Sequence, residues 1–148
     1  MEIIVIGTEP PCVRCLTTYR RARSAAQEYG EKIDVRKIAI HTDEAGRYGK
    51  VESGHGIGEA GNVKADPEKM KRLMGELNEL IKDESGNEAL IDTRLKELEG
   101  VLQPLKDKAK ELGYLMTPVL IVNGDVKSMD YVPSTDDIKA WIELENRK

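Results

Sequence analysis

The sequence is poor in aromatic residues: it has no phenylalanine, and aromatics make up only 4% of its 148 residues. A hydrophobic core must therefore come from aliphatic side chains, and the chain is long enough for one domain with such a core. The net charge of −4 argues against nucleic acid or an anionic membrane as the main partner, because both attract basic surfaces.

Long apolar runs are also missing, since none approaches the roughly 18–20 residues that cross a bilayer. The first apolar run, residues 3–6, has the length of a strand and follows Glu2 rather than a basic segment. We therefore expect no signal peptide and a cytoplasmic location. Cysteine is scarce: Cys12 and Cys15 are the only two. In the cytoplasm a structural disulfide is unusual, so a close pair indicates catalytic or metal-binding chemistry.

The N-terminal part of the chain has a strand–helix–strand pattern. Residues 3–6 predict a buried strand, which two following prolines prevent from extending. Residues 12–29 have apolar side chains three and four positions apart and predict a helix that ends at Gly30. Residues 33–40 predict a second strand. This order implies parallel strands joined by a right-handed crossover.

The C-terminal part predicts a hairpin followed by a helix. Residues 119–122 are continuously apolar and predict a central strand. Asn123-Gly124 predicts a type I′ turn, because both central positions of that turn need positive φ, so residues 125–129 should return antiparallel. A final helix is expected from Pro133-Ser134. Its apolar side should comprise Ile138, Trp141, Ile142 and Leu144.

The middle of the chain differs in composition. Residues 43–65 contain six glycines and few apolar side chains, and we interpret them as a mobile loop. The G-x-G-x-x-G pattern at residues 56–61 lacks the preceding strand that a dinucleotide site needs, so it is included in this loop. Residues 66–81 and 91–102 carry apolar stripes that predict a helical hairpin packed on the core. Another helix should run from about Pro104 to Gly113.

This order of elements predicts an α/β fold with a four-stranded mixed sheet and helices on both faces. We expect one domain, residues 1–148, with a loop and helical insertion at about residues 43–103. We see no internal repeat.

The two cysteines form a C-x-x-C motif at the predicted start of a helix. The unpaired backbone amides and the helix dipole there favour a thiolate, and Arg14 adds a positive charge. Cys12 is therefore the expected nucleophile. Cys15 lies almost one turn further on, less exposed but close enough to resolve a mixed disulfide formed on Cys12.

Two other interpretations of the cysteines stay open. A metal or iron–sulfur carrier would need thiolates from two subunits, because the chain has only two thiolates and its histidines, His41 and His55, fit no compact zinc-finger spacing. A non-catalytic binding module would use the pair only to sense redox state. We favour redox chemistry, because C-x-x-C beside a strand–helix–strand pattern is typical of it.

The chain resembles the thioredoxin-like superfamily, near glutaredoxins and small redox-active-disulfide proteins. The matching pieces are the strand before "CVRC", the segment "MTPVLIVNG" and the closing "VPSTDDIKAWI", within residues 1–42 and 104–148. The resemblance implies a cis peptide bond at Thr117-Pro118 beside the redox pair and pairing of the Thr117 backbone with an extended substrate. It also implies that Pro118 keeps metal away from the thiolates.

The departures from the superfamily concern the residues that tune the redox potential. No tryptophan precedes Cys12, and the residues in and next to the motif that would tune its potential are Pro11, Val13 and Arg14. The Gly-Gly pair that glutaredoxins use near glutathione is missing. The insertion is placed as in DsbA-like oxidoreductases, a similarity that we take as topological.

The function predicted from the sequence is thiol–disulfide oxidoreductase. It needs no cofactor beyond the Cys12–Cys15 pair. Its expected partners are a disulfide-containing protein or small molecule and an unidentified upstream reductant.

Overall fold

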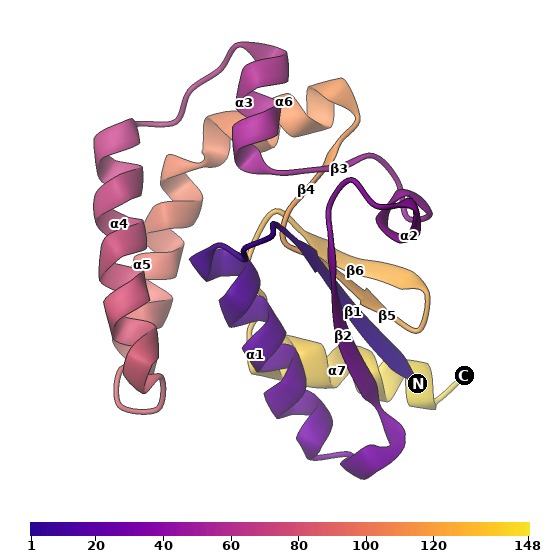
Figure 1. The fold of residues 1–148 in the computed structure, drawn as a ribbon. Helices are drawn as coiled ribbons and strands as arrows, with labels where there is room; N and C mark the ends of the chain where they lie inside the picture. Colours follow the sequence, from indigo (N-terminus) through magenta and orange to yellow (C-terminus); the bar gives the residue numbers. More distant parts are fainter. The chain divides into compact units, whose positions relative to one another are not determined.

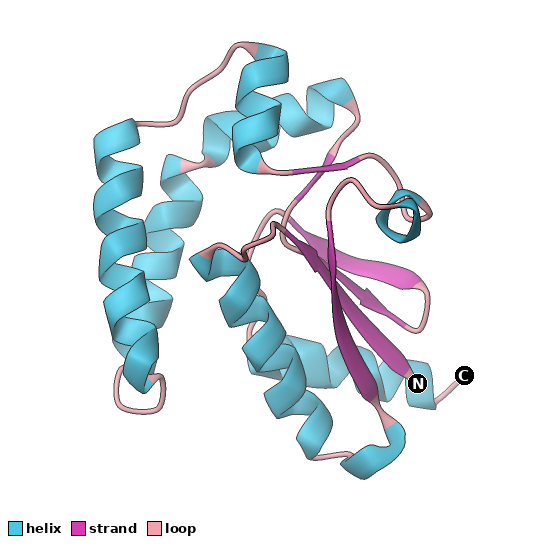
Figure 2. Ribbon diagram, viewed as in Figure 1, coloured by secondary structure: helices cyan, strands magenta, loops and turns pink.

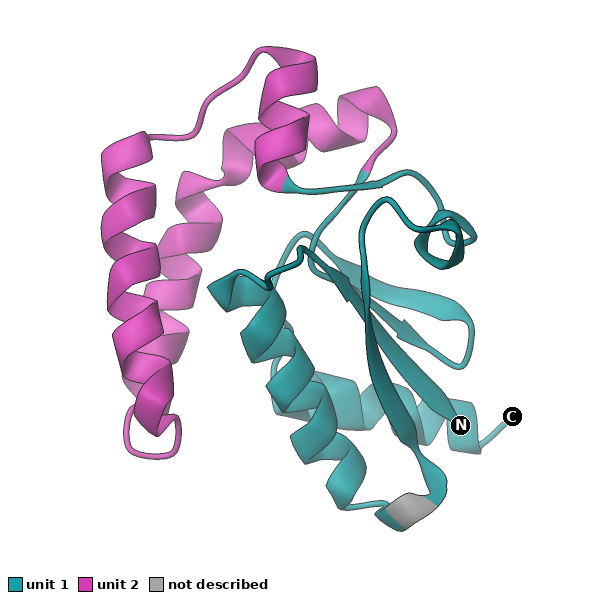
Figure 3. Cartoon of the chain, viewed as in Figure 1, with its two compact units in different colours: residues 1–53, 115–148 teal, residues 54–114 magenta. Residues whose placement is uncertain are grey.

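A computed structural model describes residues 1–148 except the side chain of Glu31. The protein forms two compact units. Unit 1 comprises residues 1–53 and 115–148, and unit 2 comprises residues 54–114 (Figure 3).

The elements of unit 1 come from both ends of the chain. Before the insertion they are β1 (Glu2–Gly7), α1 (Val13–Gln27), a 3₁₀ helix (Gly30–Lys32), β2 (Asp34–Ala39), α2 (Asp43–Gly46) and β3 (Val51–Glu52). After it they are β4 (Leu115–Met116), β5 (Val119–Val122), β6 (Asp125–Met129) and α7 (Thr135–Asn146).

The main sheet of unit 1 has four strands in the order β2-β1-β5-β6. β1 runs parallel to β2 and antiparallel to β5, and β5 runs antiparallel to β6, which confirms the predicted mixed sheet. Asn123 and Gly124 have φ of 53° and 88°, as the predicted hairpin turn requires. A second, two-stranded sheet pairs β3 with β4 in parallel.

The two faces of the main sheet bury different residues, because successive side chains of a strand point to opposite sides. Ile3 and Val5 of β1 face a core that includes residues of α1 and α7, the two helices that lie on the same side of the sheet in Figure 1. Ile4 and Ile6 face the other side, where Ala45 of α2 and Val51 of β3 cover the sheet. Leu144, expected on the apolar side of α7, is instead 51% exposed.

Unit 2 consists of helices and their connections (Figure 2). They are α3 (Gly54–Gly61), α4 (Pro67–Leu80), a 3₁₀ helix (Ile81–Asp83), α5 (Glu88–Val101) and α6 (Gln103–Leu112). Asp66 caps α4 by accepting from two backbone amides, and α4 and α5 form the predicted hairpin. Because α6 also belongs to this unit, the compact unit spans residues 54–114, whereas the insertion was expected at about residues 43–103.

The prediction of a mobile loop at residues 43–65 is wrong. These residues form α2, β3 and α3, and the G-x-G-x-x-G segment lies in α3. Its glycines allow close packing: a Cβ added to Gly58 would lie 2.8 Å from the carbonyl oxygen of Val63 and 3.3 Å from Cδ2 of Leu105. Composition suggested flexibility, whereas contacts with α6 hold this segment as a helix.

Within the described part of the chain, no helix is both long and apolar enough to cross a membrane.

Candidate functional site

The two cysteines lie where β1 leads into α1. β1 ends at Gly7, and Cys12 is the N-cap of α1, with extended backbone angles. The amide of Cys12 donates to Oγ1 of Thr8 at 3.1 Å, which ties the connection to the helix start. This connection contains a cis Glu9-Pro10 peptide bond that the sequence did not indicate. The strand-to-helix junction predicted for the motif is therefore confirmed.

Gly7 makes room for the second cysteine. A Cβ at Gly7 would lie 2.8 Å from Cβ and 2.9 Å from Sγ of Cys15, closer than real Cβ atoms approach other heavy atoms. The sequence placed Gly7 only at the end of a strand. Its role in the site depends on the position of Cys15, which the strand pattern alone could not give.

The two sulfur atoms are close but not bonded. Sγ of Cys12 and Sγ of Cys15 are 3.4 Å apart, and both thiols are free. Cys12 is half-buried, whereas Cys15 is only 3% exposed. The expected difference in exposure between the two cysteines is thus present.

The environment separates the acidities of the two thiols. The pKa of Cys12 is lowered to about 6, chiefly by the hydrogen bond with the Cys15 thiol, helped by the Cys15 amide at 3.4 Å and the charge of Arg14. Burial opposes this fall. The same thiol hydrogen bond, together with burial and the Cys12 charge, raises the pKa of Cys15. Cys12 is therefore a thiolate near neutral pH, while Cys15 keeps its proton.

Arg14 is buried, at 4% exposure, and points back into unit 1. Its Nη1 donates to the carbonyl oxygen of Thr117 at 3.2 Å, and its Nη2 donates to the carbonyl oxygen of Asp130. The sequence indicated Arg14 only as a nearby charge and a tuning residue. The structure adds that it joins the helix of the cysteines to the segment before Pro118.

The Thr117-Pro118 peptide bond is cis, as the resemblance implied. Thr117 is 3% exposed, and its amide donates to the carbonyl oxygen of Glu52 in β3 at 3.0 Å. Its carbonyl accepts from Arg14. Both backbone groups that the resemblance assigned to an extended substrate are therefore bonded within the chain.

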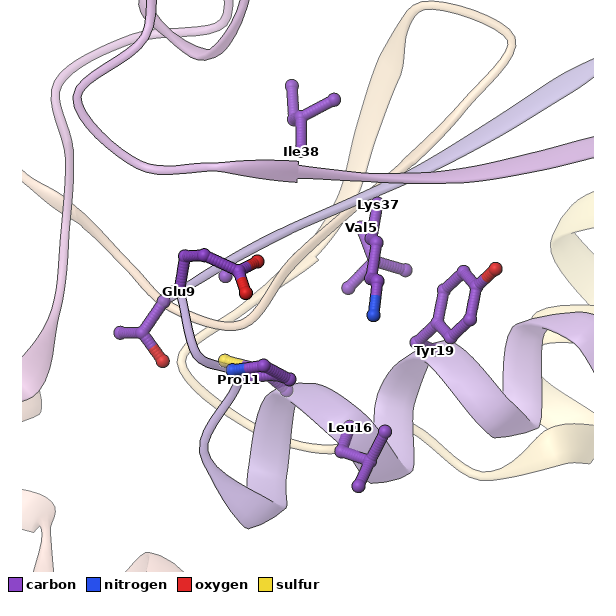
Figure 4. Close-up of a pocket in the computed structure, with 10 residues that line it drawn as sticks. Val5, Glu9, Pro11, Leu16, Tyr19, Lys37 and Ile38 are labelled. Carbon is purple, nitrogen blue, oxygen red and sulfur yellow. The ribbon is translucent and has the colours of Figure 1, made fainter.

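Cys15 is one of the residues that line a small cavity, and seven of the other lining residues are labelled in Figure 4. The volume of the cavity is about 30 Å³, which is room for about one water molecule. It is lined by Pro11, just before α1, by Leu16 and Tyr19 of α1, and by Lys37 of β2. The amine of Lys37 lies 5.3 Å from the centre of the Tyr19 ring.

The remaining tuning residue and the histidines have other surroundings. Val13 is buried at 5% exposure in the first turn of α1. His41 bonds to the Glu52 carboxylate at 3.0 Å, and His55 pairs with Glu59 in unit 2 at 2.9 Å. Among the residues that the structure describes, no three His, Cys, Asp or Glu side chains gather in a way that could hold a metal ion.

No family model, curated protein or solved structure matches this chain.

Proposed function

We propose that the protein is a thiol–disulfide oxidoreductase of thioredoxin-like type, with Cys12 as nucleophile and Cys15 as resolving thiol. The observation that carries this proposal is the position of the Cys12 sulfur. It lies at the start of α1, where it accepts from the amide of Cys15 and, once ionised, from the Cys15 thiol 3.4 Å away. These two hydrogen bonds stabilise a thiolate on the more exposed of the two cysteines.

The exchange follows from this arrangement. The Cys12 thiolate attacks one sulfur of a substrate disulfide, forms a mixed disulfide and releases the other sulfur as a thiolate. The Cys15 thiol then gives its proton to a departing thiolate, and its sulfur attacks Sγ of Cys12 from 3.4 Å away. The Cys12–Cys15 disulfide forms, and the substrate leaves as one thiol, which carries the Cys15 proton, and one thiolate, which takes its proton from water. Two electrons have passed to the substrate, and an upstream thiol reductant must return them.

The arrangement of unit 1 supports the thioredoxin-like assignment. A strand leads into the C-x-x-C helix, two helices pack on one face of a four-stranded mixed sheet, and a cis proline precedes β5. Cys12 and Pro118 are linked through Arg14, since Arg14 follows Cys12 by two positions and bonds to Thr117.

Replacement of each cysteine by serine tests this function. We expect Cys12→Ser to abolish reduction of a disulfide substrate, because no nucleophile remains at the helix start. We expect Cys15→Ser to form stable mixed disulfides on Cys12, which intact-mass analysis detects, because no resolving thiol remains. The two variants serve as matched controls for each other. If both reduce the substrate as fast as the wild type, the proposed function is wrong.

A further inference from the structure

A substrate of the proposed reaction must be held next to Cys12 while its disulfide reacts. An extended polypeptide is commonly bound by adding a strand to a free backbone edge, whose amide and carbonyl groups then pair with the peptide. The segment leading to Pro118 lies beside the motif, because Arg14 within the motif donates to the carbonyl of Thr117.

One edge of this segment is already paired. β3 runs along β4, and the amides of Leu115 and Thr117 donate to the carbonyls of Lys50 and Glu52 at 2.8 and 3.0 Å. β3 is fixed in turn through Glu52, whose carboxylate accepts from the amide of Ser53 at 2.8 Å and contacts His41. An incoming strand would therefore have to replace β3.

Two carbonyls of the segment are also bonded within unit 1. The carbonyl of Met116 accepts from the amide of Asp130 at 2.8 Å, and the carbonyl of Thr117 accepts from Arg14. A carbonyl oxygen could accept a second hydrogen bond, but Thr117 is 97% buried, so a peptide cannot reach it. Arg14 is itself buried and bonded to two carbonyls that lie 13 residues apart in the sequence, so it holds this arrangement closed.

We infer that the redox pair acts on low-molecular-weight disulfides, and that it does not hold an extended polypeptide through the backbone before Pro118. The inference rests on the proposed function and adds a substrate class to it. A small disulfide needs only access to Cys12, which is half-buried, and the cavity lined by Cys15 is too small to hold it, with room for about one water. The thiolate of Cys12 displaces that sulfur, and Cys15 completes the two-electron transfer as described above.

Two matched probes test this inference. The first is the mixed disulfide of N-acetylcysteine amide with 2-mercaptoethanol. The second carries the same mixed disulfide on the central cysteine of an extended seven-residue peptide, so that the reacting bond is identical. Second-order rate constants are measured with the reduced full-length protein at pH 8, where Cys12 is ionised.

We expect the two rate constants to agree within about twofold, because the flanking peptide groups find no backbone partner. We also expect methylation of the peptide amides next to the cysteine to leave the rate unchanged. The inference is overturned if the heptapeptide reacts tenfold faster or more and amide methylation removes the gain, since an edge must then have opened beside Cys12. In that case the proposed function still stands. If neither probe is reduced, the proposed function itself fails, and the inference fails with it.

Discussion

At the scale of single residues, the site depends on the different surroundings of two chemically identical side chains, Cys12 and Cys15. Cys12 is the N-cap of α1, and its sulfur, once ionised, accepts from Cys15, whereas Cys15 lies inside the first turn and donates both its amide and its thiol. The difference in their acidities therefore follows from a spacing of three residues at a helix start. Arg14, between them, contributes its charge to Cys12 while its donors hold two carbonyls.

The lowered pKa of Cys12 predicts how its reactivity varies with pH. The rate of alkylation by iodoacetamide should be half-maximal near pH 6, because the thiolate is the reactive form. Below pH 6 the thiol is protonated and the rate falls, whereas between pH 7 and 9 it should stay level. Stopped-flow or quenched alkylation followed by mass spectrometry measures this profile. A half-maximal rate near pH 8.5, the value for an ordinary cysteine, would contradict it.

At the scale of elements, the sequence predicted those whose signals are local. β1 and β5 are apolar runs with clear ends, and the Asn123-Gly124 turn needs only the φ preferences of its two residues. The motif at the start of α1 was predicted for the same reason. Contacts between distant residues could not be predicted. Arg14 meets Thr117 across 103 positions, and β3 is a strand of only two residues that exists because β4 pairs with it.

In the glycine-rich helix α3, contacts with distant residues outweigh the local preference of the sequence. Glycine is unfavourable in helices by roughly 1 kcal/mol relative to alanine, so four glycines in eight residues favour a loop. Gly58 and Gly61, however, lie where a Cβ would collide with Val63 and with Lys108 of α6. Contact with α6 thus compensates a poor intrinsic helix preference, and only the fold of unit 2 reveals it.

Gly58 and Gly75 should respond in opposite directions to the same substitution. Gly58→Ala would place a methyl group 2.8 Å from a backbone oxygen and should lower the free energy of unfolding by about 1–3 kcal/mol, the usual effect of overpacking. Gly75→Ala lies on the exposed side of α4 with no atom within 4 Å, and should raise it by about 0.5–1 kcal/mol. Urea unfolding followed by circular dichroism measures both. If Gly58→Ala is as stabilising as Gly75→Ala, the packing of α3 on α6 is not as described.

At the scale of the whole molecule, the acidity of one thiol is linked to the stability of unit 1. The native state holds Cys12 as a thiolate from about pH 6 upwards, whereas the unfolded chain binds a proton at this sulfur up to about pH 8.5. Between these values the unfolded state carries the extra proton, so the free energy of unfolding rises with pH. The contribution of the Cys12 thiolate to the free energy of unfolding is fully present above the pKa of this thiol in the unfolded chain. It is lost as the pH falls through about 6. Cys15 acts with the opposite sign, but only at higher pH, because its pKa is raised in the native state.

The reduced protein should therefore become more stable from pH 6 to pH 8, by at most about 1.4 kcal/mol per pH unit from this group. Urea unfolding under argon, followed by the fluorescence of Trp141, measures the change, because the single tryptophan lies in α7 of unit 1. Cys12→Ser is the matched control, and it should remove this part of the pH dependence while the contribution of the carboxylates remains. Equal slopes in the wild type and in Cys12→Ser would show that the fold does not stabilise the thiolate. The basis of the proposed exchange reaction would then be lost, because the same hydrogen bonds that stabilise the native thiolate are those that prepare Cys12 for attack.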